Sequence, residues 1–115
     1  MAISEAFQSS VSVGVTEYFL AAASTTPSYQ TTDGVYQLWL ELNNLANGDE
    51  FRLRVYEKIS SGGTARIAME WVFSHAQSEP LYVTPSLILL HGWDFSLTKL
   101  AGTDRSIAWS IRKVA

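Results

Sequence analysis

Hydrophobic and polar residues alternate with a period of two over most of this chain, which is the pattern of β-strands that bury one face. The clearest runs are residues 35–43, 51–59, 64–73 and 92–115. The side chains that this alternation predicts to face inward are Tyr36, Leu38, Leu40, Leu42, Phe51, Leu53, Val55, Ile59, Ala65, Ile67, Met69, Trp71, Phe73, Trp93, Phe95, Leu97, Ile107, Trp109 and Ile111. Residues 86–91 are almost entirely apolar and predict a strand that is covered on both faces.

Turn signals separate these runs at short, regular spacing. Asn47 and Gly48 favour a tight turn because both residue types adopt positive φ at low cost. Hairpin loops are predicted at residues 60–63 and 101–104. Pro80 and Pro85 lack the N–H that a central strand needs, so the segment between them is predicted to lie at a sheet edge. Together these signals predict one all-β domain over residues 1–115: an antiparallel β-sandwich, or jelly-roll-like fold, of about seven to nine short strands, with an extended arm over about the first ten residues.

Composition narrows the classes of function. The chain has 115 residues, no cysteine, 17% charged residues and a net charge of −3. Without cysteine there is no disulfide framework and no thiolate metal site. A net acidic domain also lacks the positive field that drives nucleic-acid binding, and no apolar run is long enough to span a membrane. We therefore expect no nucleic-acid partner and no membrane partner.

The charges are unevenly distributed along the chain. No Lys or Arg precedes Phe51, and all eight basic residues follow it. Such asymmetry favours head-to-tail contacts between copies, unless strands from the two halves interleave and bring the opposite charges together within the fold.

The sequence offers little chemistry for catalysis. His75 and His91 lack the spacing of metal ligands, and no serine lies in a nucleophile motif. Glu41 and Glu70 lie on predicted strands and face outward, while Glu57 lies near a strand end, where it is expected to emerge into solvent. We therefore expect no enzyme, no catalytic, cofactor-binding or metal-binding residue, no cofactor and no small-molecule substrate.

Six residues are candidates for contacts with other subunits because they are aromatic or basic and face outward. They are Trp39, Arg52, Arg54, Tyr56, Lys58 and Arg66. Trp39 projects from the polar face of its strand, and subunit contact, core packing and a sugar-stacking platform are all open for it. The basic residues either pair with Glu70 across a hairpin or dock on an acidic neighbour.

Several motifs within residues 30–115 resemble those of small structural proteins encoded in the head gene cluster of tailed bacteriophages. The motifs are TDGVYQ at residues 32–37, GDEFRLRVYEK at 48–58, TPSL at 84–87, GWDF at 92–95, AGTDRS at 101–106 and WSIR at 109–112. The resemblance implies a non-enzymatic virion structural protein, such as a capsid decoration or cement protein that stabilises the major capsid shell. Its implied partners are the major capsid protein and copies of itself, often as trimers. Its implied location is the capsid of a virion assembled in the host cytoplasm.

Two other functions stay open on the sequence alone. A head–tail connector or tail component would also be structural, and would differ in its copy number per particle. A carbohydrate-binding module belongs to another class. It would need Trp39 or Tyr56 exposed as a platform, with polar groups beside the ring.

Overall fold

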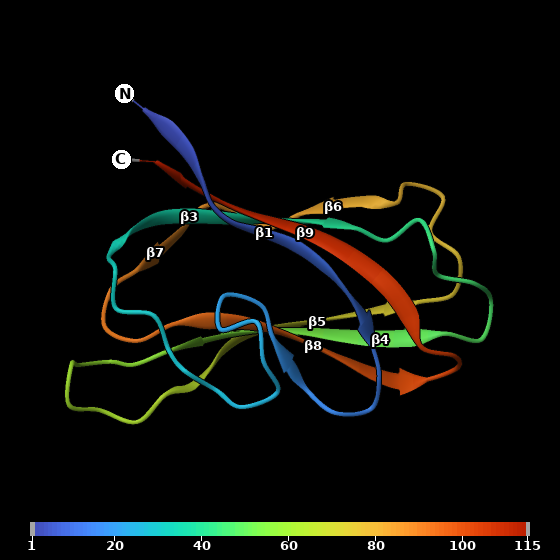
Figure 1. The fold of residues 1–115 in the computed structure, drawn as a ribbon, viewed down its shortest axis with the longest axis horizontal. Coiled ribbons are helices and arrows are strands. Elements are labelled where there is room, and N and C mark those ends of the chain that lie inside the picture. Colours follow the sequence, from blue (N-terminus) through green and yellow to red (C-terminus); the bar gives the residue numbers. More distant parts are fainter. Residues whose placement is uncertain (1, 115) are drawn as a thin grey trace.

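The computed structural model describes residues 2–114 and contains two antiparallel β-sheets packed as a sandwich (Figure 1). The strands are β1 (Ile3–Val13), β2 (Tyr18–Phe19), β3 (Gly34–Glu41), β4 (Glu50–Glu57), β5 (Arg66–Ser74), β6 (Leu81–Val83), β7 (Leu87–Leu89), β8 (Asp94–Ala101) and β9 (Arg105–Val114). This confirms the all-β sandwich predicted from the alternation. Within residues 2–114 there is no helix long and apolar enough to cross a membrane.

Strands from both ends of the chain meet in each sheet. Sheet A has the order β1-β9-β3, with β6 and β7 both pairing with the far edge of β3, and sheet B has the order β2-β8-β4-β5. β6 lies at an edge, as the flanking prolines predict. Between β6 and β7, Thr84 donates its N–H to the carbonyl of Leu38 (2.9 Å), and its Oγ1 accepts the N–H of Leu38 (3.0 Å). The hydroxyl thus continues the ladder where Pro85, which has no N–H, interrupts it.

The first residues of the chain, for which we predicted an extended arm, form a strand that is paired within sheet A. β1 pairs with β9 along its whole length, with one bulge after Glu5. The ring of Phe7 packs edge-on against Trp93, with 6.2 Å between the centroids. This contact anchors β1 to the core.

One of the two predicted hairpins is wrong. Residues 60–63 do connect the paired strands β4 and β5, but residues 102–104 lead from β8 in sheet B to β9 in sheet A. β8 and β9 both alternate like the arms of a hairpin, yet each buries its apolar face against the opposite sheet. Gly102 (φ 90°) permits this crossover, because a Cβ at that position would lie 2.2 Å from Oδ1 of Asp49.

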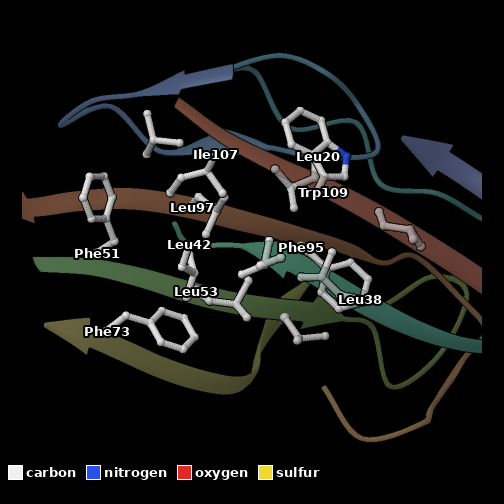
Figure 2. Close-up of a cluster of buried hydrophobic side chains, with 14 of the residues drawn as sticks. Leu20, Leu38, Leu42, Phe51, Leu53, Phe73, Phe95, Leu97, Ile107 and Trp109 are labelled. Atoms are coloured by element: carbon white, nitrogen blue, oxygen red, sulfur yellow. The ribbon is translucent and has the colours of Figure 1, made fainter. Parts of the chain in front are cut away.

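The core lies between the two sheets (Figure 2). Its buried side chains are Val13, Leu20, Tyr36, Leu38, Leu40, Leu42, Leu45, Phe51, Leu53, Val55, Phe73, Leu89, Trp93, Phe95, Leu97, Ile107, Trp109 and Ile111. The inward faces predicted for β3, for β8 and for β9 are confirmed. Tyr36 and Trp93 stack across the sandwich with 4.3 Å between their ring centroids.

β5 departs from the predicted burial pattern. Ile67 is 47% exposed and Met69 is 37% exposed, although both were expected to face inward. A bulge at Ala68 turns Ile67 outward, since Val55 pairs with Met69 while Tyr56 pairs with Ile67. Met69 stays on the inward side opposite the buried Val55, as predicted, and is partly exposed at the sheet edge. A bulge adds one residue to a strand and shifts its alternation, and β5 is also an edge strand with no neighbour on its far side.

The strand predicted over residues 86–91 is covered on one face only. Leu89 is buried, but Ile88 is 83% exposed and Leu90 is 47% exposed. β7 lies at the edge of sheet A, and Ile88 points away from the core. Ile59 was also expected inside, and it is 94% exposed because it lies in the hairpin loop after β4.

The loop between β1 and β3 covers part of the outer face of sheet B. Asp94 is fully buried beneath it and accepts the N–H groups of Ala21 (2.8 Å) and Ala22 (3.0 Å). Burial raises the pKa of Asp94 to about 6, although these backbone donors act in the opposite direction. Glu17 of the same loop accepts a hydrogen bond from the hydroxyl of Tyr56 (2.6 Å). The two carboxylates therefore fasten the loop to sheet B.

Asp49 joins two connections between the sheets. Its buried carboxylate accepts the N–H of Ala46 (2.8 Å), the N–H of Thr103 (3.0 Å) and Nε of Arg105 (2.7 Å). The β3–β4 turn, where Gly48 has a φ of 96°, is thereby tied to the β8–β9 crossover. The same donors hold the pKa of Asp49 at about 2. The ion pair with Arg105 also joins opposite charges from the two halves of the chain.

Replacing Trp109 tests how much the core depends on this ring. Trp109 is 3% exposed, so we expect Trp109→Ala to lower the free energy of unfolding by about 3–5 kcal/mol through the cavity that it leaves. The indole Nε1 has no hydrogen-bond partner in the described part of the chain, so Trp109→Phe should cost clearly less. Urea denaturation followed by circular dichroism measures both variants. Equal losses would contradict the volume argument.

Acid denaturation tests the role of Asp49. Its pKa in the folded state, about 2, lies below the ordinary value of 3.8, so its contribution to stability is complete above about pH 4 and is lost as the pH falls towards 2. In that window the unfolding free energy of the wild type should fall more steeply than that of Asp49→Asn. The raised pKa of Asp94 favours folding at low pH, but it is common to both proteins and cancels in the difference. Parallel curves would contradict the prediction.

Candidate functional site

The outer face of sheet A is a surface without a second layer over it in the described part of the chain, and it points to the top of Figure 1. We call the outward-facing residues of its strands the sheet A face. They are Ile3, Glu5, Gln8, Ser10, Val35, Gln37, Trp39, Glu41, Leu81, Val83, Ile88, Ala108, Ser110, Arg112 and Val114. The pairing of β9 with β3 places Trp39 level with Ser110, between a row that contains Arg112 and a row that contains Glu41.

Trp39 is held in one orientation by its neighbours. Its Nε1 donates to Oε1 of Gln37 (3.2 Å), and Nε2 of Gln37 donates to the carbonyl of Thr84 (2.8 Å). The guanidinium carbon of Arg112 lies 4.1 Å from the centroid of the indole ring, which is a cation–π geometry. Nε of Arg112 in turn donates to Oγ of Ser110 (3.2 Å). Because these side chains are already ordered, a partner that binds here would lose less conformational entropy in fixing them.

The position of Trp39 bears on the three roles that the sequence left open for it, namely subunit contact, core packing and a sugar-stacking platform. It lies on the outer face, so it is not a core residue. Arg112 stacks on the ring, so one face of the indole is already occupied, whereas a sugar platform needs a free face. Beside the ring lies a hollow of about 240 Å³, lined in part by the small side chains of Ala108 and Ser110.

Arg52 and Arg54 lie on the other side of the molecule, on the outer face of sheet B. Nε of Arg54 lies 2.7 Å from Oε1 of Glu70, and Nε of Arg52 lies 3.7 Å from the same oxygen. Of the two explanations for the basic stripe, cross-strand pairing with Glu70 is therefore confirmed. Both arginine side chains are less than a quarter exposed, which leaves little of either for a partner.

The three remaining candidates have different surroundings. Tyr56 is 9% exposed and lies beneath the β1–β3 loop, so it offers no platform to a ligand. The side chain of Lys58 packs against Gly92. A Cβ atom added at Gly92 would lie within 2.8 Å of the Lys58 side chain. Arg66 is exposed and lies opposite Glu57 in the pairing of β5 with β4. The six candidates thus form no single site, since Trp39 lies on sheet A and the other five lie on sheet B.

A second surface lies at the β5 and β7 side of the sandwich, and we call it the open edge. It is formed by the exposed apolar side chains of Ile59 and Ile67, which line one hollow, and by Leu90, whose N–H binds the neighbouring Glu57. Ile88 is not part of it, because Ile88 pairs with Val35 and faces outward on sheet A. Nearer β6 this side is closed, because Tyr82 packs on the rings of Trp71 and Phe73 with centroid distances of 5.9 Å and 4.8 Å. Lys58 and Arg66 line a hollow at the open edge together with Ile59 and Ile67.

Glu57 shapes the open edge from within and does not simply emerge into solvent. Its carboxylate accepts the N–H groups of Leu90 (2.6 Å), His91 (3.2 Å) and Gly92 (2.9 Å). Burial by itself raises the pKa of Glu57, but these backbone donors outweigh it, and the net pKa is lowered. The end of β4 is thereby fixed to the connection between β7 and β8.

Sequence reasoning missed Arg112 as the neighbour of Trp39. The alternation places Arg112 on the outer face of β9 and Trp39 on the outer face of β3. The alternation does not show that β9 and β3 pair with each other, because these strands are far apart along the chain. The apolar residues of the open edge were missed because they were assigned to the core.

Neither surface has the composition of a metal site, and the chain as a whole matches no known family. No three His, Cys, Asp or Glu residues among positions 2–114 are grouped as metal ligands. No protein-family model matches the chain, and no curated protein matches it. Among solved structures, the Eiger TNF from S. frugiperda is 14% identical with a TM-score of 0.46, covering 97% of this chain and 88% of its own. The xylan-binding domain from CBM 22 is 13% identical with a TM-score of 0.36, covering 86% of this chain and 64% of its own.

Replacing Glu57 tests its part in forming the open edge. Glu57→Ala leaves three successive backbone N–H groups without their acceptor, so we expect a loss of about 1–3 kcal/mol in the free energy of unfolding. Glu79→Ala is the matched control because Glu79 is exposed in a loop. Chemical denaturation compares the two variants, and amide exchange at Leu90 and Gly92 should accelerate in Glu57→Ala alone. Unchanged exchange at these amides would contradict the assignment.

Proposed function

We propose that the chain is a non-enzymatic structural protein of a virion, which coats the capsid as a decoration or cement protein and binds the major capsid protein. The observation that carries the proposal is the open edge. Exposed apolar side chains gathered on one part of a folded surface are typical of protein–protein contact sites. The resemblance of several sequence motifs to those of phage head proteins suggests a virion as the setting.

The open edge suits a protein partner with apolar and acidic groups. Ile59 and Ile67 are 94% and 47% exposed, and both would lose unfavourable hydration on contact with a partner. Lys58 and Arg66 beside them would favour carboxylates at the rim of the partner surface. Glu57 already has backbone donors for its carboxylate, so it adds little charge repulsion.

A cement function requires no tight single contact. Many copies on one shell act together, so modest individual affinities add up to a large cost of separating neighbouring capsomers. The proposal places the chain on particles in high copy number, whereas a head–tail connector or tail component would be present in far fewer copies. The glycan-binding alternative has less support, because Arg112 covers one face of the Trp39 ring.

Copy number per particle tests the proposal directly. Intact heads purified by density gradient should contain the chain in hundreds of copies, a number set by the repeating shell, and quantitative mass spectrometry measures it. About a dozen copies would indicate the neck or tail instead. Absence from the particle band would overturn a virion role and would make polysaccharide binding the next measurement.

A substitution at the open edge tests the surface itself. Ile59→Asp combined with Ile67→Asp should abolish binding to shells that lack the chain, measured by co-sedimentation, because it places charge in an apolar contact. Val15→Asp is the matched control, since Val15 is 73% exposed on the loop after β1. Thermal unfolding should be unchanged in all variants. Full binding by the double variant would exclude the open edge as the contact.

A further inference from the structure

The sheet A face is complementary to itself in charge and in shape. Arg112 and Glu41 lie in rows on opposite sides of Trp39. Neither of them forms an ion pair with any residue from 2 to 114. The large ring of Trp39 stands beside the hollow over Ala108 and Ser110. Arg112 and Glu41 are charges of opposite sign on either side of an aromatic ring, which an identical surface can match, and Glu5, which lies opposite Arg112, adds one further acid to the Arg112 row.

We propose that the sheet A face binds a second copy of this chain, with a two-fold axis passing close to Trp39. In such a contact every pair of facing residues occurs twice. When two sheets pack face to face, the axis lies in the plane between them. An axis that runs across β9 and β3 at the level of Ser110 and Trp39 exchanges the Arg112 row with the Glu41 row. Arg112 of each copy then faces Glu41 of the other, and the strands of the two sheets cross obliquely, as packed sheets normally do.

The central contact has the composition of an interface core. The two Trp39 rings meet near the axis, where each can extend over the small side chains of the other copy. Tryptophan and arginine are enriched in such contacts. Leu81, which is 53% exposed at the rim of the face, becomes covered as the sheets approach.

The size of the face sets the expected strength. Four strands spaced at about 4.8 Å, with four rows of side chains about 6.8 Å apart, give a footprint on the order of 500 Å² per copy. The total of about 1,000 Å² is at the lower limit of specific interfaces. We therefore expect a dimer that dissociates on dilution and weakens as salt screens the Arg112–Glu41 contacts.

A second copy explains the face better than other partners do. An acidic peptide would pair with Arg112 but would bring negative charge towards Glu41 and Glu5. A sugar could stack only on the ring face that Arg112 leaves uncovered, and it would leave the charges of Arg112 and Glu41 without partners. An identical face satisfies both free charges at once.

Charge reversal tests the contact with the full chain in solution. Sedimentation velocity at low salt, from roughly 10 μM to 1 mM, should show the mass rising from 12.7 kDa towards twice that value. Arg112→Glu alone and Glu41→Arg alone should each weaken the dimer by about tenfold or more, because like charges then face each other twice. An equimolar mixture of the two variants should form dimers again, since the glutamate introduced in one variant would face the arginine introduced in the other.

Matched controls separate the contact from net charge. Arg66→Glu and Glu79→Arg change the charge equally at exposed positions away from this face and should leave the dimer unchanged. If Arg112→Glu does not fold, Arg112→Gln replaces it, and it should weaken the dimer as Glu41→Gln does, because each removes one partner of the same contact. A wild type that stays monomeric at the highest concentration, a trimer, or a mixture that stays monomeric would each overturn the proposal. So would binding of a polysaccharide that Trp39→Ala abolishes. Because no particle takes part, failure here is distinct from failure of the shell proposal.

Discussion

The register of β9 between β1 and β3 is the constraint on which the rest of the structure depends. Arg112 lies opposite Glu5 on one side and Gln37 on the other, and Trp109 lies opposite Leu40. Because side chains alternate between faces, a slip of one residue would turn Trp109 to the surface and Arg112 into the core. Burial of the apolar face of β9 therefore also decides which polar groups surround Trp39. The core and the sheet A face are two results of one pairing.

Sequence could predict those features that a single strand carries by itself. The alternation in β3, β8 and β9 was sufficient to assign their buried faces and to place Trp39 outside. The alternation did not predict the buried face at the start of β5. A bulge at Ala68 reverses the alternation there, and no residue in the sequence signals that bulge. It also could not separate a hairpin from a crossover at Gly102, because two alternating strands joined by a short turn fit both. The neighbours of Trp39 depend on pairing between distant strands, which no local pattern contains.

Three carboxylates act as internal hydrogen-bond acceptors rather than as surface charges. Asp49, Glu57 and Asp94 each accept backbone N–H groups at a connection between strands. Each therefore serves as an internal acceptor in a fold with many crossovers and few regular turns, where backbone donors would otherwise lack partners. Asp49 also pairs with Arg105 from the second half of the chain. Interleaving of the two halves thus brings one acid of the first half against a base of the second.

The two faces of the sandwich differ in what covers them. On sheet B the β1–β3 loop buries polar side chains of β8, and Asp94 and Glu17 fasten it there. Sheet A keeps an ordered but uncovered face around Trp39, and the open edge lies at another side of the molecule. A copy can therefore contact a second copy and a shell at the same time. A two-fold pair would present two open edges on one rigid body, and since the first contact holds the second edge near the shell, the second would bind at a high effective concentration. On these proposals, self-association through Trp39 strengthens attachment without any change in the open edge itself.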